Sequence, residues 1–117
     1  MEIKGNKILV TGGAGFIGSH VVCSLVEQGA EVIVYDNLSS GLMENLESVM
    51  DKIKFIGGDI LDYQKLEECM RGCDVVSHHA AQLEIFLSKR SPEKDLEVNT
   101  IGTLNVLRQL KRMMLRK

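Results

Sequence analysis

Apolar and polar positions in the first third of the chain predict a strand, a helix and a second strand. Lys7–Thr11 and Glu31–Asp36 are short, mainly apolar runs with the length of buried parallel strands. Between them, Ile17, Val21 and Leu25 recur at every fourth position, which predicts the buried face of a helix. The whole segment has the roughly 30 residues that a right-handed crossover between parallel strands requires.

The same alternation continues through the middle of the chain. A short helix is expected over Met43–Met50, followed by a strand over Ile53–Ile56. Asp62 is placed to cap a helix over Tyr63–Arg71, and Asp74–His78 supplies a fourth strand. The first of these helices is expected to face the core with three apolar side chains: Leu46, Val49 and Met50.

A longer helix is expected near the C-terminus. Ser91–Pro92–Glu93 has a capping residue followed by proline, a strong helix start, and the helix should continue to about Met113 or Met114. Gly102 inside this helix costs roughly 1 kcal/mol against alanine, so we expect it to allow a close contact with the backbone. The expected buried stripe consists of four apolar side chains: Ile101, Leu104, Leu107 and Leu110. Strands that alternate with helices in this way indicate a doubly wound, parallel α/β fold.

Composition and charge narrow the class of protein. The 117 residues are the size of one domain spanning residues 1–117, and 44 % apolar and 26 % charged residues are typical of a globular chain. No apolar run approaches the ~20 residues of a membrane span, and the N-terminus has no signal-peptide core. We therefore expect a cytoplasmic protein without a membrane partner. A net charge of −2 argues against nucleic acid as a partner. The basic C-terminal KRMMLRK is interpreted as complementing a helix dipole.

Three cysteines leave one alternative to consider. Cys23, Cys69 and Cys73 are an odd number, which favours reduced thiols. Because His78 and His79 follow Cys69 and Cys73 closely in the sequence, a zinc site must be considered. The four-residue spacing fits structural zinc poorly, so small buried thiols are favoured and no metal site is expected.

The segment KILVTGGAGFIGSH, residues 7–20, fits two phosphate-binding patterns. Its glycines make GxGxxG from Gly13 or GxxGxxG from Gly12, and both patterns end at Gly18. A strand precedes the turn and a helix follows, so unpaired backbone N–H groups would meet a pyrophosphate there. Asp36 lies 18 residues beyond the last glycine, where it would accept hydrogen bonds from a ribose and repel a 2′-phosphate, which favours NAD over NADP. The alternative is a glycine-rich turn that only packs a helix against a sheet.

Five ordered motifs resemble those of the extended short-chain dehydrogenase/reductases: TGGAGFIGSH, YDNLSSG, GDI, HHAAQ and EVNTIGTLNVL. Within that group, the chain is similar to the NAD-dependent epimerase/dehydratase family, whose UDP-glucose 4-epimerase-like members act on nucleotide sugars. The resemblance extends from about residue 5 to about residue 110. It implies a Rossmann-like dinucleotide-binding domain, and it would cover only the first part of a family member.

The resemblance also selects the glycine register. It implies GxxGxxG, with three functional glycines: Gly12, Gly15 and Gly18. Gly13 would then be an extra, permissive position. Phe16 and Ile17 would cover the pyrophosphate with their backbone N–H groups, and Asp36 would hold the adenosine ribose.

Further residues are implied around the adenine ring. Four would line its side of the site: Asn37, Ser39, Ser40 and Gly41. Asp59 and Ile60 would contact the ring itself, the carboxylate accepting a hydrogen bond from the exocyclic amine. The alternative for Asp59 is an ordinary turn or capping aspartate.

The resemblance places a last group beside the cofactor's second ribose and nicotinamide: His79, Ala80, Ala81 and Gln82. Alanines suit this place because the cofactor passes close to the backbone. Asn99 would lie near the active site, or else make a packing hydrogen bond. His78 precedes His79 on a strand, so the two side chains point to opposite faces and cannot both be in the site.

The chemistry that the resemblance implies needs residues that this sequence lacks. Family members use a tyrosine and a lysine four residues apart, with a serine or threonine on the preceding strand. The two tyrosines, Tyr35 and Tyr63, are followed at that spacing by Ser39 and Glu67. We therefore expect no catalytic residue, no substrate domain and a sheet truncated after about four strands, so that the chain is inactive alone.

An incomplete sheet also predicts association. A fourth strand without a fifth would expose the edge at 75–77, and the last helix is the one through which family members commonly dimerise. Met113, Met114 and Leu115 are expected to be exposed, so a homodimer or pairing with a missing second half is expected. Three functions stay open: the NAD-binding portion of a nucleotide-sugar epimerase/dehydratase, a non-catalytic NAD sensor or regulatory subunit, and an inactive remnant.

Overall fold

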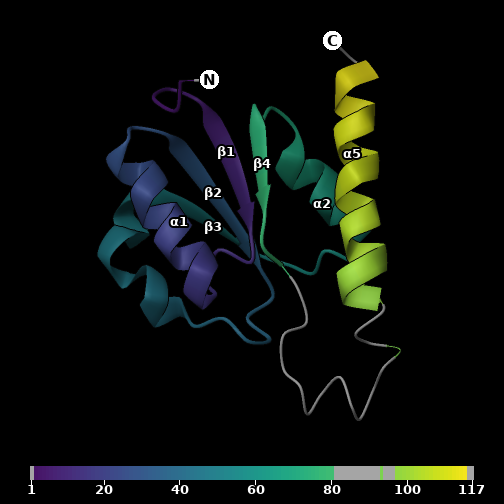
Figure 1. The fold of residues 1–117 in the computed structure, drawn as a ribbon, viewed down its shortest axis with the longest axis horizontal. Coiled ribbons are helices and arrows are strands. Elements are labelled where there is room, and N and C mark those ends of the chain that lie inside the picture. The colour runs from purple at the N-terminus through teal and green to yellow at the C-terminus, as the bar shows by residue number, and fades with distance from the viewer. Residues whose placement is uncertain (1, 81–92, 94–96, 116–117) are drawn as a thin grey trace.

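A four-stranded sheet forms the centre of the protein (Figure 1). This computed structural model describes residues 2–80, 93 and 97–115. The strands are β1 (Lys7–Thr11), β2 (Glu31–Asp36), β3 (Ile53–Gly57) and β4 (Val75–His78), in the order β3-β2-β1-β4. Every neighbouring pair is parallel. The prediction of a doubly wound parallel α/β fold with four strands is confirmed.

Five helical segments are described, and they lie on both faces of the sheet. They are α1 (Phe16–Glu27), the 3₁₀-helix η1 (Met43–Lys52), α2 (Tyr63–Met70), the π-helical turn η2 (Glu97–Gly102) and α5 (Thr103–Leu115). Figure 1 shows α1 in front of the sheet, with α2 and α5 on the other side. None of the described helices has the length and apolar character needed to cross a membrane.

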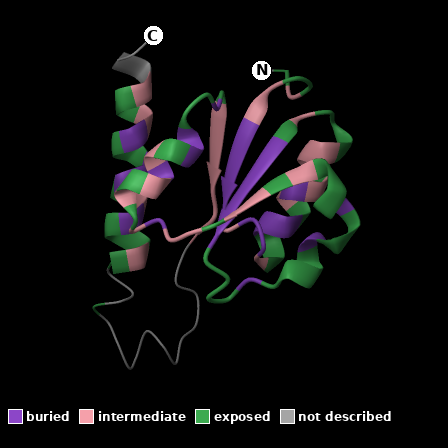
Figure 2. Ribbon diagram, turned by 180° about the vertical axis from the view of Figure 1, so that it is seen from behind, coloured by how far each residue is buried: buried purple, intermediate pink, exposed green. Residues whose placement is uncertain are grey.

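The central strands β1 and β2 are buried on both faces, because successive side chains point to opposite layers (Figure 2). Leu9 and Ile33 pack in one layer with Leu66 and Met70 of α2 and Val106 of α5. The opposite layer contains four apolar residues of the two strands together with residues of α1 and η1: Ile8, Val10, Val32, Val34, Val22, Leu46 and Val49. Burial on both faces explains why these strands appear in the sequence as continuous apolar runs.

The two helices on the α1 side differ in detail from the sequence prediction. Val22 is fully buried in α1, whereas Val21 and Leu25 are half-buried and Ile17 is 65 % exposed. The face containing Gly18 lies nearest the sheet, because the glycine turn approaches the helix at that residue.

In η1, Leu46 and Val49 are buried as expected, but Met50 is 38 % exposed. The three-residue period of a 3₁₀-helix explains this, because it places positions 46 and 49 on one face and turns position 50 away.

The stripe predicted for the last helix was wrong at three of its four positions, while Leu110 does pack against the core. Ile101, Leu104 and Leu107 are 44 %, 41 % and 56 % exposed. The buried side of α5 instead presents Asn105 and Gln109, which are 7 % and 1 % exposed, together with Val106. Partly buried residues flank this polar face and pack against the core: Leu110 and Met113.

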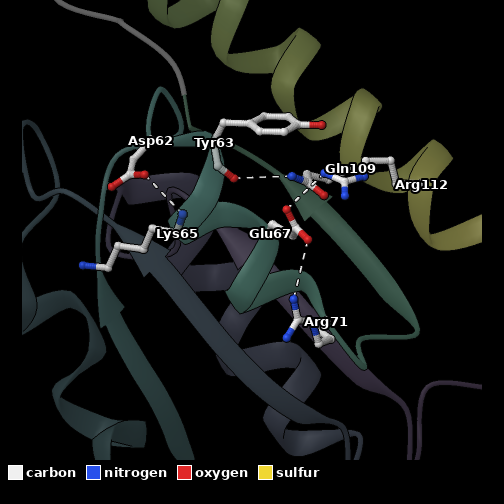
Figure 3. A network of polar contacts seen from close by, with 7 residues as sticks. All are labelled: Asp62, Tyr63, Lys65, Glu67, Arg71, Gln109 and Arg112. Atoms are coloured by element: carbon white, nitrogen blue, oxygen red, sulfur yellow. Dashed lines mark hydrogen bonds and ion pairs between the residues drawn. The ribbon is translucent and has the colours of Figure 1, made fainter.

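Hydrogen bonds explain why the polar face of α5 is the inner one. Asn105 Nδ2 donates to the backbone oxygen of Ile60 at 3.0 Å, and Gln109 Nε2 donates to that of Tyr63 at 3.4 Å. Farther along, Arg112 forms an ion pair with Glu67 at 3.1 Å, and Glu67 also pairs with Arg71 at 3.5 Å (Figure 3). The helix is therefore oriented by carbonyl groups at the start of α2 that need donors.

Three other expectations from the sequence concern the last helix and its ends. The close contact expected at Gly102 is confirmed, because a Cβ there would lie 2.7 Å from Cγ1 of Ile60. Met113 is half-buried rather than exposed. Ser91 and Pro92 and the side chains of Met114 and Leu115 lie outside the described part of the chain.

Candidate functional site

The residues singled out in the sequence gather at the carboxyl edge of the sheet. The glycine turn follows β1, Asp36 ends β2, Asp59 follows β3 and His79 follows β4. In the order β3-β2-β1-β4, the chain leaves β1 toward one side and later returns to pair β4 on the other. Ligands of open α/β sheets bind at such a reversal, outside the carboxyl ends of the strands.

Gly12 forms the narrowest part of the turn. Its φ of +67° lies in the left-handed region, and its N–H donates to the Tyr35 carbonyl oxygen at 2.9 Å. A Cβ at this position would lie 2.7 Å from the backbone nitrogen of Ala80 and from the backbone carbon of His79. The position therefore needs glycine both for its conformation and for its contact with the segment after β4.

The remaining glycines pack on Gly12 itself. A Cβ on Gly15 would lie 3.2 Å from the Gly12 oxygen, and one on Gly18 would clash with that oxygen and lie 2.9 Å from the Gly12 carbonyl carbon. These contacts explain why each position of the GxxGxxG register is a glycine. Gly13 is not permissive, contrary to expectation, because a Cβ there would lie 2.7 Å from Cγ1 of Val34 in the core.

The start of α1 is suited to an anion. Gly15 caps the helix without a side-chain hydrogen bond, and the first turn contains no acidic residue. The side chains of Phe16 and Ile17 are 78 % and 65 % exposed, so they point into solvent and do not pack over the backbone of the glycine turn. Unpaired N–H groups and the positive end of the helix dipole favour a phosphate at such a terminus.

Asp36 braces the glycine turn from β2. Its Oδ2 accepts a hydrogen bond from Ala14 N at 2.9 Å, and its Oδ1 accepts one from Leu38 N at 2.8 Å. The side chain is almost fully buried at 8 % exposure. Each carboxylate oxygen retains a second lone pair, so a ribose hydroxyl could be accepted without breaking either bond.

The residues after Asp36 form a tight connection beside the turn. Asn37 Oδ1 accepts from Ser39 N at 3.0 Å, and Ser39 and Ser40 are exposed. Gly41 is buried, and a Cβ there would lie 2.9 Å from the carbonyl carbon of Ala14. The structure therefore brings this predicted segment against the glycine turn.

Asp59 and Ile60 have structural roles of their own. Asp59 Oδ1 caps the following turn by accepting from Leu61 N at 2.9 Å, and its Oδ2 accepts from Asn37 Nδ2 at 3.3 Å. The capping role agrees with the alternative weighed for this residue. Ile60 is buried at 4 % exposure and its side chain packs in the core beneath Gly102. Its backbone oxygen accepts a hydrogen bond from Asn105.

The remaining predicted residues lie after β4 and in η2. His79 and Ala80 follow β4 and are half-buried, and His79 Nε2 lies 2.8 Å from Ser77 Oγ. Ala81 and Gln82 lie outside the described residues. Asn99 is exposed in η2, and its backbone oxygen accepts from Thr103 Oγ1 at 3.0 Å.

Two residues that support the site were missed. Asn45 Nδ2 donates to the Ala14 oxygen at 2.9 Å, and Leu42 N donates to the same oxygen at 3.0 Å. Thr11 is fully buried, and its hydroxyl accepts hydrogen bonds from the backbone after β4. The only signal in the sequence was the position of Thr11 directly before the glycines, and nothing marked Asn45.

Acid–base and metal chemistry find little support in the described residues. Tyr35 is fully buried and donates to the Asp59 oxygen at 2.7 Å, and burial raises its pKa far above the usual range, so it is unsuited to proton transfer. Burial also raises the pKa of the Cys69 and Cys73 thiols. Within the described chain, no group of three or more His, Cys, Asp or Glu side chains is placed to hold a metal ion.

Comparison with known proteins supplies the family. The sequence model described as "NAD dependent epimerase/dehydratase family" matches residues 8–117. The chain belongs to this family. The epimerase/dehydratase fold, a Rossmann-like sheet with helices on both faces, is the one observed.

Individual family members are similar over most of the chain. UDP-glucose 4-epimerase of Halalkalibacterium halodurans is 44 % identical over 105 residues, which are 88 % of this chain and 30 % of that protein. The structure of Thermus thermophilus UDP-glucose 4-epimerase in complex with NAD is 42 % identical with a TM-score of 0.81, covering 91 % of this chain and 34 % of that one.

A dTDP-glucose 4,6-dehydratase structure from Streptomyces venezuelae with NAD bound is similar to the same degree. Its sequence is 38 % identical, its TM-score is 0.83, and the match covers 88 % of this chain and 35 % of that one. The chain thus spans about a third or less of the length of the epimerase/dehydratase relatives it matches.

Proposed function

We propose that this chain is the NAD-binding portion of a nucleotide-sugar epimerase/dehydratase of the UDP-glucose 4-epimerase type, with residues 1–117 forming the dinucleotide-binding domain. The observation that carries the proposal is the backbone cradle of Gly12, Gly15 and Gly18 beside the buried carboxylate of Asp36. A side chain at any of the three glycines would collide with the backbone of the turn or of the segment after β4, and it would displace the N–H groups that would meet a pyrophosphate at the helix terminus. The relatives with NAD in their structures support the same ligand.

The residues of this chain would bind and orient the cofactor. The backbone of the glycine turn and the first turn of α1 would hold the pyrophosphate, and Asp36 would accept from the adenosine ribose. Asn37, Ser39, Ser40 and Gly41 would line the adenine side with Asp59 and the backbone of Ile60. His79 and Ala80, with Ala81, Gln82 and Asn99, would lie toward the nicotinamide half, where bound NAD accepts and returns a hydride.

The chain by itself is proposed to be inactive. Tyr35 is buried with a raised pKa, and neither tyrosine of the sequence is followed by a lysine at the spacing that the family uses. A nucleotide sugar would bind only in a completed enzyme. The buried free thiols Cys69 and Cys73 are those of a protein in a reducing compartment, which supports a cytoplasmic location.

A titration of NAD and NADP against the purified chain tests the proposal. We expect NAD to bind more tightly than NADP, and Asp36→Ala to weaken NAD binding by roughly tenfold or more, the value of a hydrogen bond to a charged group. The matched control is Asp51→Ala, which removes an exposed carboxylate of η1. Unfolding midpoints of all three proteins verify that the variants fold.

The NADP arm separates two roles of Asp36. If its carboxylate meets the ribose, the substitution narrows the preference for NAD because the repulsion of the 2′-phosphate is lost. If the carboxylate only braces Ala14, both affinities fall together. Equal, weak binding of NAD by the wild type and Asp36→Ala would contradict the proposal and leave an NAD-independent remnant as the better description.

A further inference from the structure

His78 joins three elements that meet beside the glycine turn. Its Nδ1 lies 2.5 Å from Oγ1 of Thr11, the last residue of β1. Its Nε2 lies 3.0 Å from Oγ1 of Thr103, the first residue of α5. A single half-buried ring on β4 therefore links the start of the glycine turn to the last helix.

The hydrogen bonds of Thr11 determine that Nδ1 of His78 is an acceptor. Thr11 Oγ1 accepts a hydrogen bond from Ala80 N at 3.2 Å. It also accepts one from His79 N at 3.0 Å, and the same N–H donates to the backbone oxygen of Thr11 as well. A hydroxyl has two lone pairs and one hydrogen. With its lone pairs directed to the two N–H groups, the hydroxyl has its hydrogen left to donate to Nδ1.

The hydrogen bonds at Nε2 of His78 indicate the same neutral tautomer. Thr103 Oγ1 donates to the Asn99 backbone oxygen at 3.0 Å, so its lone pairs are left to accept from Nε2–H of His78. The chain of bonds therefore runs in one direction through a neutral ring that carries its proton on Nε2.

A second proton on His78 would disrupt this chain. Nδ1–H would point at a hydroxyl whose lone pairs are already used, and the Thr11 hydrogen would lose its acceptor. The groups that β1 and α5 present to the ring nitrogens, Thr11 and Thr103, are uncharged and offer no compensation. Burial, together with the neighbouring titratable His79 directly after β4, also lowers the pKa of His78.

The bond between His78 and Thr11 lies next to the contact that shapes the site. Gly12 follows Thr11 directly and touches the backbone of His79 and Ala80. The same hydroxyl that donates to His78 holds that backbone in place. A Thr11 hydroxyl that turns away from His78 therefore changes how the glycine turn meets the segment after β4.

We propose that His78 is a positioning residue of the dinucleotide site and makes that site acid-sensitive. Neutral His78 holds the glycine turn against the segment after β4, and protonated His78 releases it. This inference rests on the proposed NAD binding, and it adds a form of regulation to that site.

The test compares NAD binding across pH in three proteins. Between about pH 8 and pH 5, the interval in which histidines titrate, the Kd of the wild type for NAD should rise on acidification. The rise should reach up to about tenfold per pH unit below the pKa of His78, the slope for one proton. His78→Gln, which does not titrate, should show a flatter profile, and His20→Gln on the exposed side of α1 should keep the wild-type profile.

A nuclear magnetic resonance measurement on the wild type needs no variant. Ring nitrogen shifts of labelled histidine should show His78 as the Nε2–H tautomer at neutral pH, titrating below the value of about 6.5 found for a free histidine side chain. An Nδ1–H tautomer would overturn the proposal.

Each binding outcome has one meaning. Identical pH profiles for the wild type and His78→Gln, with NAD bound near neutral pH, overturn the role of His78 and leave the NAD-binding proposal standing. Absence of NAD binding at every pH overturns the proposed function and this inference with it. A steeper wild-type profile supports both.

Discussion

Individual glycines determine the shape of the candidate site through backbone contacts. Gly12 touches the segment after β4, and Gly15 and Gly18 touch Gly12, so the turn and the helix N-terminus form one closely packed unit. Asp36 and Asn45 hold Ala14 in the middle of this turn from two sides. The backbone N–H groups of the turn are thus held in place without a ligand, which would lower the cost of the proposed NAD binding.

A substitution at Gly18 tests this packing. In Gly18→Ala the new methyl group meets the Gly12 carbonyl, which is backbone and cannot rotate away. We expect a loss of about 1–3 kcal/mol in the free energy of unfolding, as for other overpacked sites, together with loss of NAD binding. Urea denaturation and NAD titration measure the two effects.

Gly57→Ala is the matched control for that experiment. A Cβ at Gly57, in β3, would have its nearest neighbour at 3.8 Å, an ordinary van der Waals contact. Its stability and NAD affinity should remain those of the wild type. If Gly18→Ala behaves like Gly57→Ala, the turn is not as tightly packed as described.

The lowered pKa of His78 predicts how stability depends on pH. Below about pH 6.5 the unfolded chain binds a proton at this histidine that the folded chain does not, so the free energy of unfolding decreases as the pH falls toward the folded pKa. Above that range both states are neutral at His78 and the dependence disappears. Urea denaturation at several pH values should give a flatter curve for His78→Gln, and parallel curves would contradict the prediction.

At the scale of elements, α5 is attached to α2 by polar groups as well as by apolar side chains such as Val106. Asn105 and Gln109 supply donors to carbonyl groups at the start of α2, while Arg112 and Glu67 pair at the surface. Each buried carbonyl group left without a donor would cost about 1–3 kcal/mol. This is why Asn105 and Gln109 lie on the inner side of the helix beside Val106, while Leu104 and Leu107 face outward.

Two substitutions on α5 distinguish the buried from the exposed polar contacts. Asn105→Ala leaves the Ile60 oxygen without its donor, and we expect it to lower the free energy of unfolding by about 1–3 kcal/mol. Arg112→Ala removes an exposed ion pair that solvent screens, so little change is expected. Urea denaturation of both variants checks this order, and the reverse order would contradict it.

On the scale of the whole molecule, the sheet and α5 leave surfaces that suit association. Among the described strands, β4 pairs with β1 alone. Ile101, Leu104 and Leu107 form an exposed apolar row on η2 and α5. We propose, as the sequence suggested, that a second copy or a separate second half covers these surfaces.

Sedimentation equilibrium tests whether the second copy is the partner. The wild type should be a dimer at high concentration, and Leu104→Lys with Leu107→Lys should shift it to monomer, because a charge would be buried at the contact. Met50→Lys is the control, since Met50 is a similarly exposed apolar residue on the opposite side of the sheet. A wild type that stays monomeric, or a dimer unaffected by the double variant, would contradict the proposal.

The sequence by itself determined the strands, their alternation with helices and which glycine and polar residues lie at the carboxyl edge. Apolar runs such as Glu31–Asp36 become strands in any parallel sheet that is covered on both faces, and a glycine-rich turn before a helix has few other uses. Asp36 was identified because its distance along the chain follows from the length of one crossover. These features depend on local spacing, which a sequence displays directly.

Only the tertiary structure decided which groups meet. Helical periodicity located the last helix but not its inner face, because the carbonyl oxygens of Ile60 and Tyr63 that select Asn105 and Gln109 lie more than 40 residues earlier in the chain. The packing of Gly13 against Val34 and the bonds of His78 to Thr11 and Thr103 likewise join residues more than 20 positions apart. Hydrogen bonding and close packing act between neighbours in space, and the fold alone makes such residues neighbours.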